Sequence, residues 1–143
     1  MRRFVLDASI ALAWCFEDES RASADLVLHI LEGAEAVVPA IWHMEIGNSL
    51  LNAERRGRIG LAGTTRSLAH LKSLPIRVDN TPVAVFIEPL IALARERKLS
   101  VYDAGYLELA MREGIALATL DGALKRAAVA VGVRLLPDRP NKP

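Results

Sequence analysis

Three aspartates stand where a buried strand or an apolar segment gives way to a helix. Asp7 ends an apolar run in VLDAS, Asp121 follows another in ATLDGAL, and Asp103 opens a helical pattern in SVYDAGYLELA. Each alone is typical of a helix N-cap, because aspartate accepts hydrogen bonds from the first backbone N–H groups and favours the positive end of the helix dipole. For any single aspartate, capping is the simpler explanation.

Taken together, the three aspartates indicate a different chemistry. In an open parallel α/β sheet the carboxyl ends of all strands lie along one edge, so Asp7 and Asp121 must share it. Asp103 reaches this edge if its helix leads back toward the strand before Asp121. Carboxylates gathered there repel one another, and a divalent cation removes that repulsion. Hard oxygen ligands suit Mg²⁺ or Mn²⁺, so the set predicts a metal site.

Glu45 cannot be explained as a helix cap. In AIWHMEIGNSLLNAERRG it lies inside a helical pattern rich in apolar residues, with Trp42 and Ser49 among its neighbours one turn away. The alternative explanation is a salt bridge, but the basic residues of that helix, Arg55 and Arg56, lie too far along it. A basic residue elsewhere in the chain remains open as a partner. The position favours a functional role for Glu45.

The composition is that of one globular domain. The chain has 143 residues, of which 52% are hydrophobic and 5% aromatic, so we expect a core of Ala, Leu, Val and Ile. The formal charge is +1, so any anionic partner must meet local patches rather than a global field. The single cysteine, Cys15, excludes an internal disulfide and a cysteine-based metal cluster, and fits a small core residue.

The N-terminal segment imitates a secretory signal, because Met-Arg-Arg precedes an apolar run that ends in the cleavage-like Ala-Leu-Ala. Asp7 interrupts that run, so we expect no signal peptide. No stretch approaches the roughly 20 apolar residues that a membrane-spanning helix needs. We therefore expect a soluble, cytoplasmic protein without a membrane partner.

Short runs of Val, Ile and Leu alternate with helical patterns, which predicts a parallel α/β sheet covered on both faces. The predicted strands are residues 3–6, 36–38, 76–78, 115–119 and 133–135. The predicted helices are residues 9–16, 21–32, 41–56, 61–74, 82–97, 104–112 and 123–131. Left-handed helix ends are expected at Gly33, Gly57, Gly114 and Gly132. We expect one domain over residues 1–136 and a flexible polar tail over 137–143.

Other chemistry-bearing residues form no recognisable motif. His43 and Glu45 are two residues apart and point to different helix faces, and no HExxH occurs. Tyr102 and Tyr106 flank Asp103 at helical spacing, and we interpret them as packing residues rather than platforms for base stacking. No glycine-rich phosphate loop or Ser-His-Asp arrangement is evident.

Four motifs in chain order carry a family resemblance. DAS at Asp7, EIGN at Glu45, YDAGY at Asp103 and ATLD at Asp121 resemble those of the PIN-domain ribonucleases, and more narrowly the VapC toxins of type II toxin–antitoxin systems. The likeness covers nearly the whole chain, up to GVRLLP near its end. Each motif alone is weak, whereas the ordered set is fairly specific.

The resemblance implies a three-layer α/β/α sandwich with a five-stranded parallel sheet. It implies a Mg²⁺- or Mn²⁺-dependent endoribonuclease that cleaves transfer or ribosomal RNA and leaves a 5′-phosphate and a 3′-hydroxyl. It also implies a homodimer and a VapB-type antitoxin whose C-terminal segment covers the active site. The catalytic and metal-binding acids carried over by position are Asp7, Glu45, Asp103 and Asp121. The supporting polar residues are Ser9, Asn48 and Thr119. Some PIN domains have a further acid after the last one, whereas GALK follows here, which argues against a strongly held second metal ion.

Two basic clusters are candidate RNA phosphate contacts. The first consists of Arg55, Arg56 and Arg58. The second consists of Arg95, Arg97 and Lys98. The alternative is that these are solvated helix-end charges favoured by the helix dipole.

Two other function classes remain open. A receiver-like or dehalogenase-like phosphotransfer domain also places aspartate at strand ends with Mg²⁺, but the adjacent acids of receivers and the second aspartate of DxDx[TV] are missing after Asp7. A non-catalytic PIN-like binding module could use the Ala- and Leu-rich helix 61–74 as a groove for a protein partner. Such a module should tolerate loss of all four acids.

Overall fold

The computed structural model describes residues 2–16 and 21–138. Five parallel strands form one sheet in the order β3-β2-β1-β4-β5. The strands are β1 (Arg2–Leu6), β2 (Ala34–Val38), β3 (Ile76–Val78), β4 (Ala116–Ala118) and β5 (Leu135–Leu136). The predicted parallel α/β sheet is confirmed, including the number of its strands.

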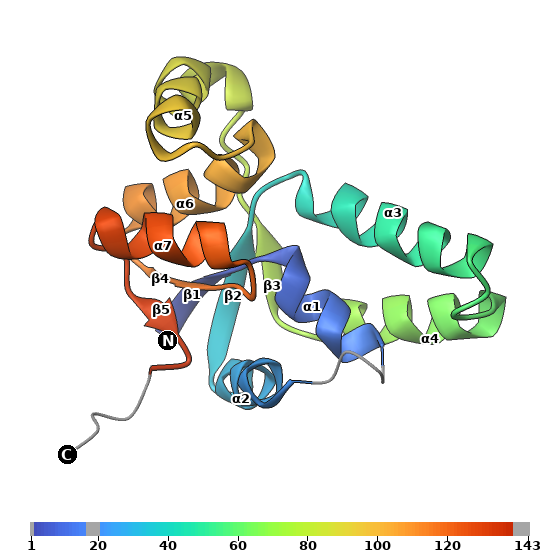
Figure 1. Cartoon of the computed structure of the whole chain (residues 1–143). Helices are drawn as coiled ribbons and strands as arrows, with labels where there is room; N and C mark the ends of the chain where they lie inside the picture. The colour runs from blue at the N-terminus through green and yellow to red at the C-terminus, as the bar shows by residue number, and fades with distance from the viewer. Residues whose placement is uncertain (1, 17–20, 139–143) are drawn as a thin grey trace.

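Helices cover both faces of the sheet. They are α1 (Ala8–Cys15), α2 (Ala22–Leu31), α3 (Trp42–Arg55), α4 (Leu61–Lys72), α5 (Val83–Arg97), α6 (Val101–Glu113) and α7 (Gly122–Ala130). Helices α1–α4 lie on one side and α5–α7 on the other, as right-handed crossovers require for this strand order (Figure 1). The architecture is the expected three-layer sandwich.

The strand order reverses between β1 and β4, which are neighbours in the sheet although more than 100 residues separate them. Leu6 pairs with Ala118, and the Asp7 N–H continues the ladder by donating to the Ala118 carbonyl at 2.9 Å. Such a reversal opens a crevice at the carboxyl ends of the strands, because the connecting helices leave in opposite directions. Asp7 and Asp121 both follow strands that flank this point.

The core consists mainly of aliphatic side chains, as the composition predicts. Phe4, Val5 and Leu6 of β1 and Leu117 of β4 are fully buried. Strands buried on both faces carry continuous apolar runs instead of alternating ones, which explains the FVL and ALA segments. Cys15 packs half-buried against this core, and its thiol contacts the Ala11 carbonyl at 3.3 Å.

Helix α6 begins earlier than predicted. Ser100 caps it, and the Ser100 Oγ accepts a hydrogen bond from the Asp103 backbone N–H at 3.0 Å. The prediction that Asp103 opens this helix was therefore wrong. Asp103 lies in the first turn, so its own side chain is not used as the cap.

The last two strands are shorter than the sequence predicted. Strand β4 stops at Ala118 because Thr119 turns the chain: its Oγ1 accepts the Asp121 N–H at 3.0 Å. Strand β5 begins at Leu135 instead of residue 133, since the Val133 N–H still bonds to Ala128 of α7. Left-handed helix ends were predicted at four glycines, and positive φ is found at three of them, Gly57, Gly114 and Gly132, but not at Gly33. Helix α5 also ends in the left-handed region, at Lys98 (φ 56°), which was not predicted.

Residues 139–143 of the predicted flexible tail lie outside the described residues, and Asp138 forms ion pairs with Arg2 and Arg134. Among the described residues, no helix is both long enough and apolar enough to cross a membrane.

Candidate active site

Asp7 is a buried carboxylate held by two hydroxyl groups. Its side chain is 5% exposed, and it lies at the start of α1 without capping that helix. The Ser9 Oγ donates to Asp7 Oδ2 at 2.6 Å, and the Thr119 Oγ1 donates to the same oxygen at 2.7 Å. The other carboxylate oxygen, Oδ1, has no hydrogen-bond partner among residues 2–16 and 21–138. One oxygen thus fixes the carboxylate and the other is left for a ligand.

Each of the two hydroxyls is itself fixed by a backbone N–H of the turn after β4. The Ser9 Oγ accepts from Leu120 N at 2.9 Å, and the Thr119 Oγ1 accepts from Asp121 N at 3.0 Å. Each hydroxyl has one proton, and both donate it to Asp7. The contact of 3.4 Å between Ser9 Oγ and Thr119 Oγ1 therefore contributes little to the stability of the site. The turn after β4 therefore sets the position of the acid after β1.

Asp121 both caps a helix and faces the same edge. Its Oδ1 accepts from the Leu124 N–H at 2.9 Å, which makes it the N-cap of α7. Its Oδ2 forms no hydrogen bond with the described part of the chain. Capping and ligand binding are thus compatible here, because a carboxylate has two oxygens.

Glu45 is held by a tyrosine from another element. The Tyr106 hydroxyl of α6 donates to Glu45 Oε1 at 2.7 Å, across 61 residues of sequence. The Tyr106 ring is fully buried, whereas Glu45 is half-buried on α3. The expected alternative, a distant basic partner for Glu45, is not found among the described residues. The interpretation of Tyr106 as a packing residue was incomplete, because its hydroxyl belongs to the site.

Burial and mutual repulsion raise the pKa of three of the acids. Burial raises the pKa of Asp7; the hydroxyls of Ser9 and Thr119 oppose this, and the charges of Asp103 and Asp121 add to it. The pKa of Glu45 rises through burial and through the charges of Asp7 and Asp103, against the Tyr106 hydrogen bond. Burial, followed by the charge of Asp121, raises the pKa of Asp103. The four carboxylates therefore act electrostatically on one another.

The described side chains form no ready-made metal cage. No three of the described His, Cys, Asp and Glu side chains converge closely enough to hold an ion as they stand. The donor set nevertheless fits a hard divalent cation, because it consists of four carboxylates, each with at least one oxygen that forms no hydrogen bond with the described residues. No described Lys, Arg or His forms an ion pair with any of them. Binding would require the partly exposed Asp103 and Asp121 side chains to move toward Asp7.

The other predicted site residues lie farther out. Asn48 is exposed on α3, one turn beyond Glu45. Arg55 and Arg56 are exposed at the end of α3, where the dipole favours positive charge. The Arg58 guanidinium stacks 4.6 Å from the centre of the Phe16 ring.

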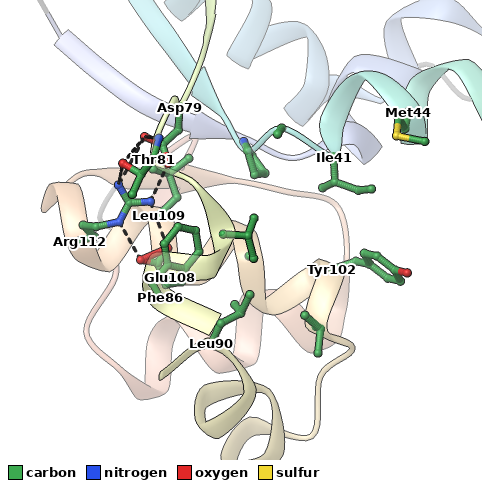
Figure 2. A pocket seen from close by; sticks show the side chains of 15 residues that line it. Ile41, Met44, Asp79, Thr81, Phe86, Leu90, Tyr102, Glu108, Leu109 and Arg112 are labelled. Atoms are coloured by element: carbon green, nitrogen blue, oxygen red, sulfur yellow. Dashed lines mark hydrogen bonds and ion pairs between the residues drawn. The ribbon is translucent and has the colours of Figure 1, made fainter. Parts of the chain in front are cut away.

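An apolar cavity of about 310 Å³ lies between the start of α3 and helices α5 and α6 (Figure 2). Met44 and Tyr102, which immediately precede Glu45 and Asp103, line it and are 72% and 62% exposed. Deeper in, Arg112 bonds to Asp79 and Glu108, each at 2.7 Å. This network ties the segment after β3 to α6, and the sequence alone did not reveal it.

Comparison with known proteins identifies the architecture. The PIN domain matches this sequence over residues 4–130, which is most of the chain. The chain belongs to the PIN-domain family. This membership replaces the receiver-like and dehalogenase-like alternatives and agrees with the resemblance of the four acidic motifs. PIN-domain nucleases generally use a divalent metal ion.

Relatives of this PIN domain include proteins of the VapC type. It is 33% identical over 88 residues to a protein named exonuclease VapC9 from Pyrobaculum aerophilum, a match that spans 59% of this chain and 63% of that relative. The crystal structure of PAE2754 from the same organism is similar with a TM-score of 0.67 and 27% identity, covering 88% of this chain and 86% of that one.

Two toxin–antitoxin complexes share the fold of this PIN domain at lower sequence identity. VapBC2 from Rickettsia felis, bound to a promoter DNA fragment, has a TM-score of 0.64 and 14% identity and covers 93% of this chain and 96% of the other. A toxin–antitoxin complex from Klebsiella pneumoniae has a TM-score of 0.55 and 21% identity, covering 82% and 85%.

Proposed function

We propose that this protein is the toxin of a type II toxin–antitoxin system and acts in the cytoplasm as a metal-dependent endoribonuclease. The observation that carries the proposal is the arrangement around Asp7. A buried carboxylate is costly unless something compensates its charge. Asp7 has two hydroxyl donors, one free oxygen, and three further acids within electrostatic range but no described cationic partner. The name of the VapC9 relative supports a nuclease of the VapC type, and the fold of the two complexes supports a toxin.

The proposed cofactor is Mg²⁺ or Mn²⁺, held directly by Asp7 and Asp103, with Asp121 completing the site and Glu45 acting through the attacking water. Such an ion supplies positive charge to the phosphodiester and activates water. Asp7 is the most rigid of these groups, because Ser9 and Thr119 fix its Oδ2. Its position therefore sets that of the others.

The remaining acids position the reactants. Glu45 directs its free Oε2 to the attacking water and accepts its proton, since burial makes this carboxylate more basic than usual by raising its pKa. The water oxygen bonds to phosphorus while the bond from phosphorus to the 3′ oxygen breaks. The 3′ oxygen takes a proton from solvent water, and Glu45 afterwards releases to the solvent the proton that it accepted. The products are a 5′-phosphate and a 3′-hydroxyl.

End-labelled total RNA tests the proposal, with antitoxin-free protein and Mn²⁺ and with EDTA as the control. Discrete internal fragments that disappear with EDTA are expected. A ladder shortened progressively from one end would instead indicate an exonuclease, the activity in the name of the VapC9 relative. Intact RNA in the presence of folded protein and Mn²⁺ would favour the non-catalytic binding module.

The RNA contacts proposed outside the acids are Arg55, Arg56 and Arg58. Arg55 and Arg56 extend from the end of α3, the helix that carries Glu45. Arg58 lies close to Phe16, just beyond the end of α1. Phosphates that leave the acids along the side of α1 and α3 would reach this cluster.

The proposed protein partners are a VapB-type antitoxin and a second copy of this chain. The apolar cavity and its exposed rim suit the second copy, because large exposed apolar patches mark interfaces. The rim includes Met44 and Tyr102, both more than half exposed. Met44 and Tyr102 adjoin acids, so a dimer formed here would bring two sets of carboxylates close together.

Met44→Glu is expected to convert the dimer to a monomer, because the substitution places a charge in the apolar rim. Light scattering coupled to size-exclusion chromatography measures the mass directly. Leu61→Glu is the matched control: Leu61 is 75% exposed, close to the 72% of Met44, but lies on α4, away from the cavity. A dimer that survives Met44→Glu but not Leu61→Glu would move the interface to α4.

A further inference from the structure

A second groove lies on the α7 side of the molecule. Its volume is about 820 Å³, and it lies between α7, the edge strand β5 and the start of α2. Its lining residues include Thr119, whose hydroxyl donates to Asp7 and accepts from Asp121 N. A ligand in the groove would therefore lie next to the residue that orients the buried carboxylate.

Two cations line the groove without an acidic partner. Lys125 and Arg126 of α7 form no ion pair with any residue of the described part of the chain, whereas Arg77, Arg112 and Arg134 do. An unpaired guanidinium and ammonium on neighbouring residues repel each other. An anion between them would relieve that repulsion.

The helix dipole makes this position unfavourable for positive charge. A Cβ on Gly122 would lie 3.3 Å from Arg126 Nη1, so the guanidinium folds back over the first residue of α7. Cations are stabilised at helix C-termini and destabilised at N-termini. The helix dipole accounts for a positive charge at Arg55, at the end of α3, but it does not account for one at Arg126.

The rest of the lining is largely apolar. Val129 is 68% exposed, and Leu135, Leu136 and Pro137 form the wall along β5. Single-stranded nucleic acid is bound by combining cations for the phosphates with apolar surface for the bases and sugars. Nothing in the lining reads base edges in a fixed pattern, so contacts here would tolerate many sequences.

We propose that this groove binds the phosphate backbone of single-stranded RNA beside the cleaved bond, with Lys125 and Arg126 as the phosphate contacts. The proposal rests on the proposed ribonuclease function and adds a substrate path to it. Thr119 lines the groove and also bonds to Asp7, which favours RNA over a protein as the ligand. An RNA chain with one phosphate at the acids must place its next nucleotides on an adjacent surface.

Binding of a fluorescein-labelled oligouridylate tests the groove. Anisotropy is measured with EDTA at several salt concentrations, using proteins that carry Asp103→Asn to prevent cleavage. Adding Lys125→Ala and Arg126→Ala is expected to raise Kd about tenfold and to reduce the slope of log Kd against log salt by about 1.4, the value for two single-strand phosphates. Lys72→Ala, which removes an exposed charge from the end of α4, is expected to change neither quantity.

Steady-state cleavage in the active background gives a second measurement. The Lys125→Ala, Arg126→Ala protein should show a raised KM with kcat unchanged, because these residues bind substrate outside the reacting centre. A kcat loss at constant KM, or equal effects of the α4 control, would overturn the groove assignment. Unchanged RNA binding with lost inhibition by the antitoxin would assign the groove to a protein. If the wild type neither binds nor cleaves RNA, the ribonuclease proposal itself fails.

Discussion

Asp7→Asn is expected to reduce RNA cleavage about 10³-fold or more and yet to raise the melting temperature of the metal-free protein. Asparagine has nearly the same shape, and its side-chain oxygen can replace Oδ2 as the acceptor for Ser9 and Thr119. Its amide group replaces Oδ1, the oxygen left for a ligand. Activity is lost because the charge and the ligand oxygen are lost, while the local hydrogen bonds remain.

The stability gain follows from the direction of the pKa shift. Burial, with the neighbouring acids, raises the pKa of Asp7, so its ionised form costs stability in the folded protein. An increase of about 3 °C would correspond to roughly 1 kcal/mol in a chain of this length. Thermal unfolding in EDTA at neutral pH measures it. A clear decrease would contradict the prediction and would indicate that the charge of Asp7 stabilises the start of α1.

The same shift fixes the sign of the pH dependence. The folded state retains the Asp7 proton at a higher pH than the unfolded chain, so metal-free wild type gains stability as pH falls through the folded pKa. The gain is complete below the unfolded value near 3.8. The Asp7→Asn protein lacks this contribution, so the two melting temperatures should converge in acid. Mn²⁺ at neutral pH should raise the melting temperature of the wild type more than that of the variant.

The position of Asp7 and Asp121 at one edge of the sheet could be predicted from the sequence. Short apolar runs that alternate with helical patterns indicate a parallel sheet, and in a parallel sheet the carboxyl ends of the strands lie on one side. The role of each oxygen could not be predicted. Capping and ligand binding looked like alternatives for Asp121, but one oxygen caps α7 and the other stays free. Sequence patterns assign residues to positions, whereas the two oxygens of a carboxylate are distinguished only by their three-dimensional neighbours.

Other features escaped prediction because they depend on contacts across the fold. Ser100 and Asp103 are both good capping residues three positions apart, and only the backbone geometry selects Ser100. The groove beside Lys125 and Arg126 is assembled from three segments, and neither residue stands in a motif. Tyr106 was interpreted as a packing residue from its helical spacing beside Asp103, and its ring is fully buried. Its hydroxyl meets Glu45, which lies 61 residues away on another helix.

Tyr106→Phe is expected to lower kcat by about 10- to 100-fold while KM changes little. Phenylalanine keeps the ring in the core, so packing is preserved, but Glu45 Oε1 loses its only described hydrogen-bond donor. A half-buried carboxylate without that donor can rotate away from the position that directs Oε2 toward the site. Interactions that orient groups in the transition state appear in kcat instead of KM.

Tyr102→Phe is the matched control for this tyrosine. It removes the same hydroxyl from the residue next to Asp103, but Tyr102 is 62% exposed and its hydroxyl donates to no described residue. Cleavage by Tyr102→Phe should equal that of the wild type. If Tyr106→Phe also cleaved normally, at an unchanged melting temperature, Glu45 would not need a fixed orientation. If it raised KM alone, Glu45 would contact the substrate in the ground state, and the attacking water would have to be oriented by another of the acids.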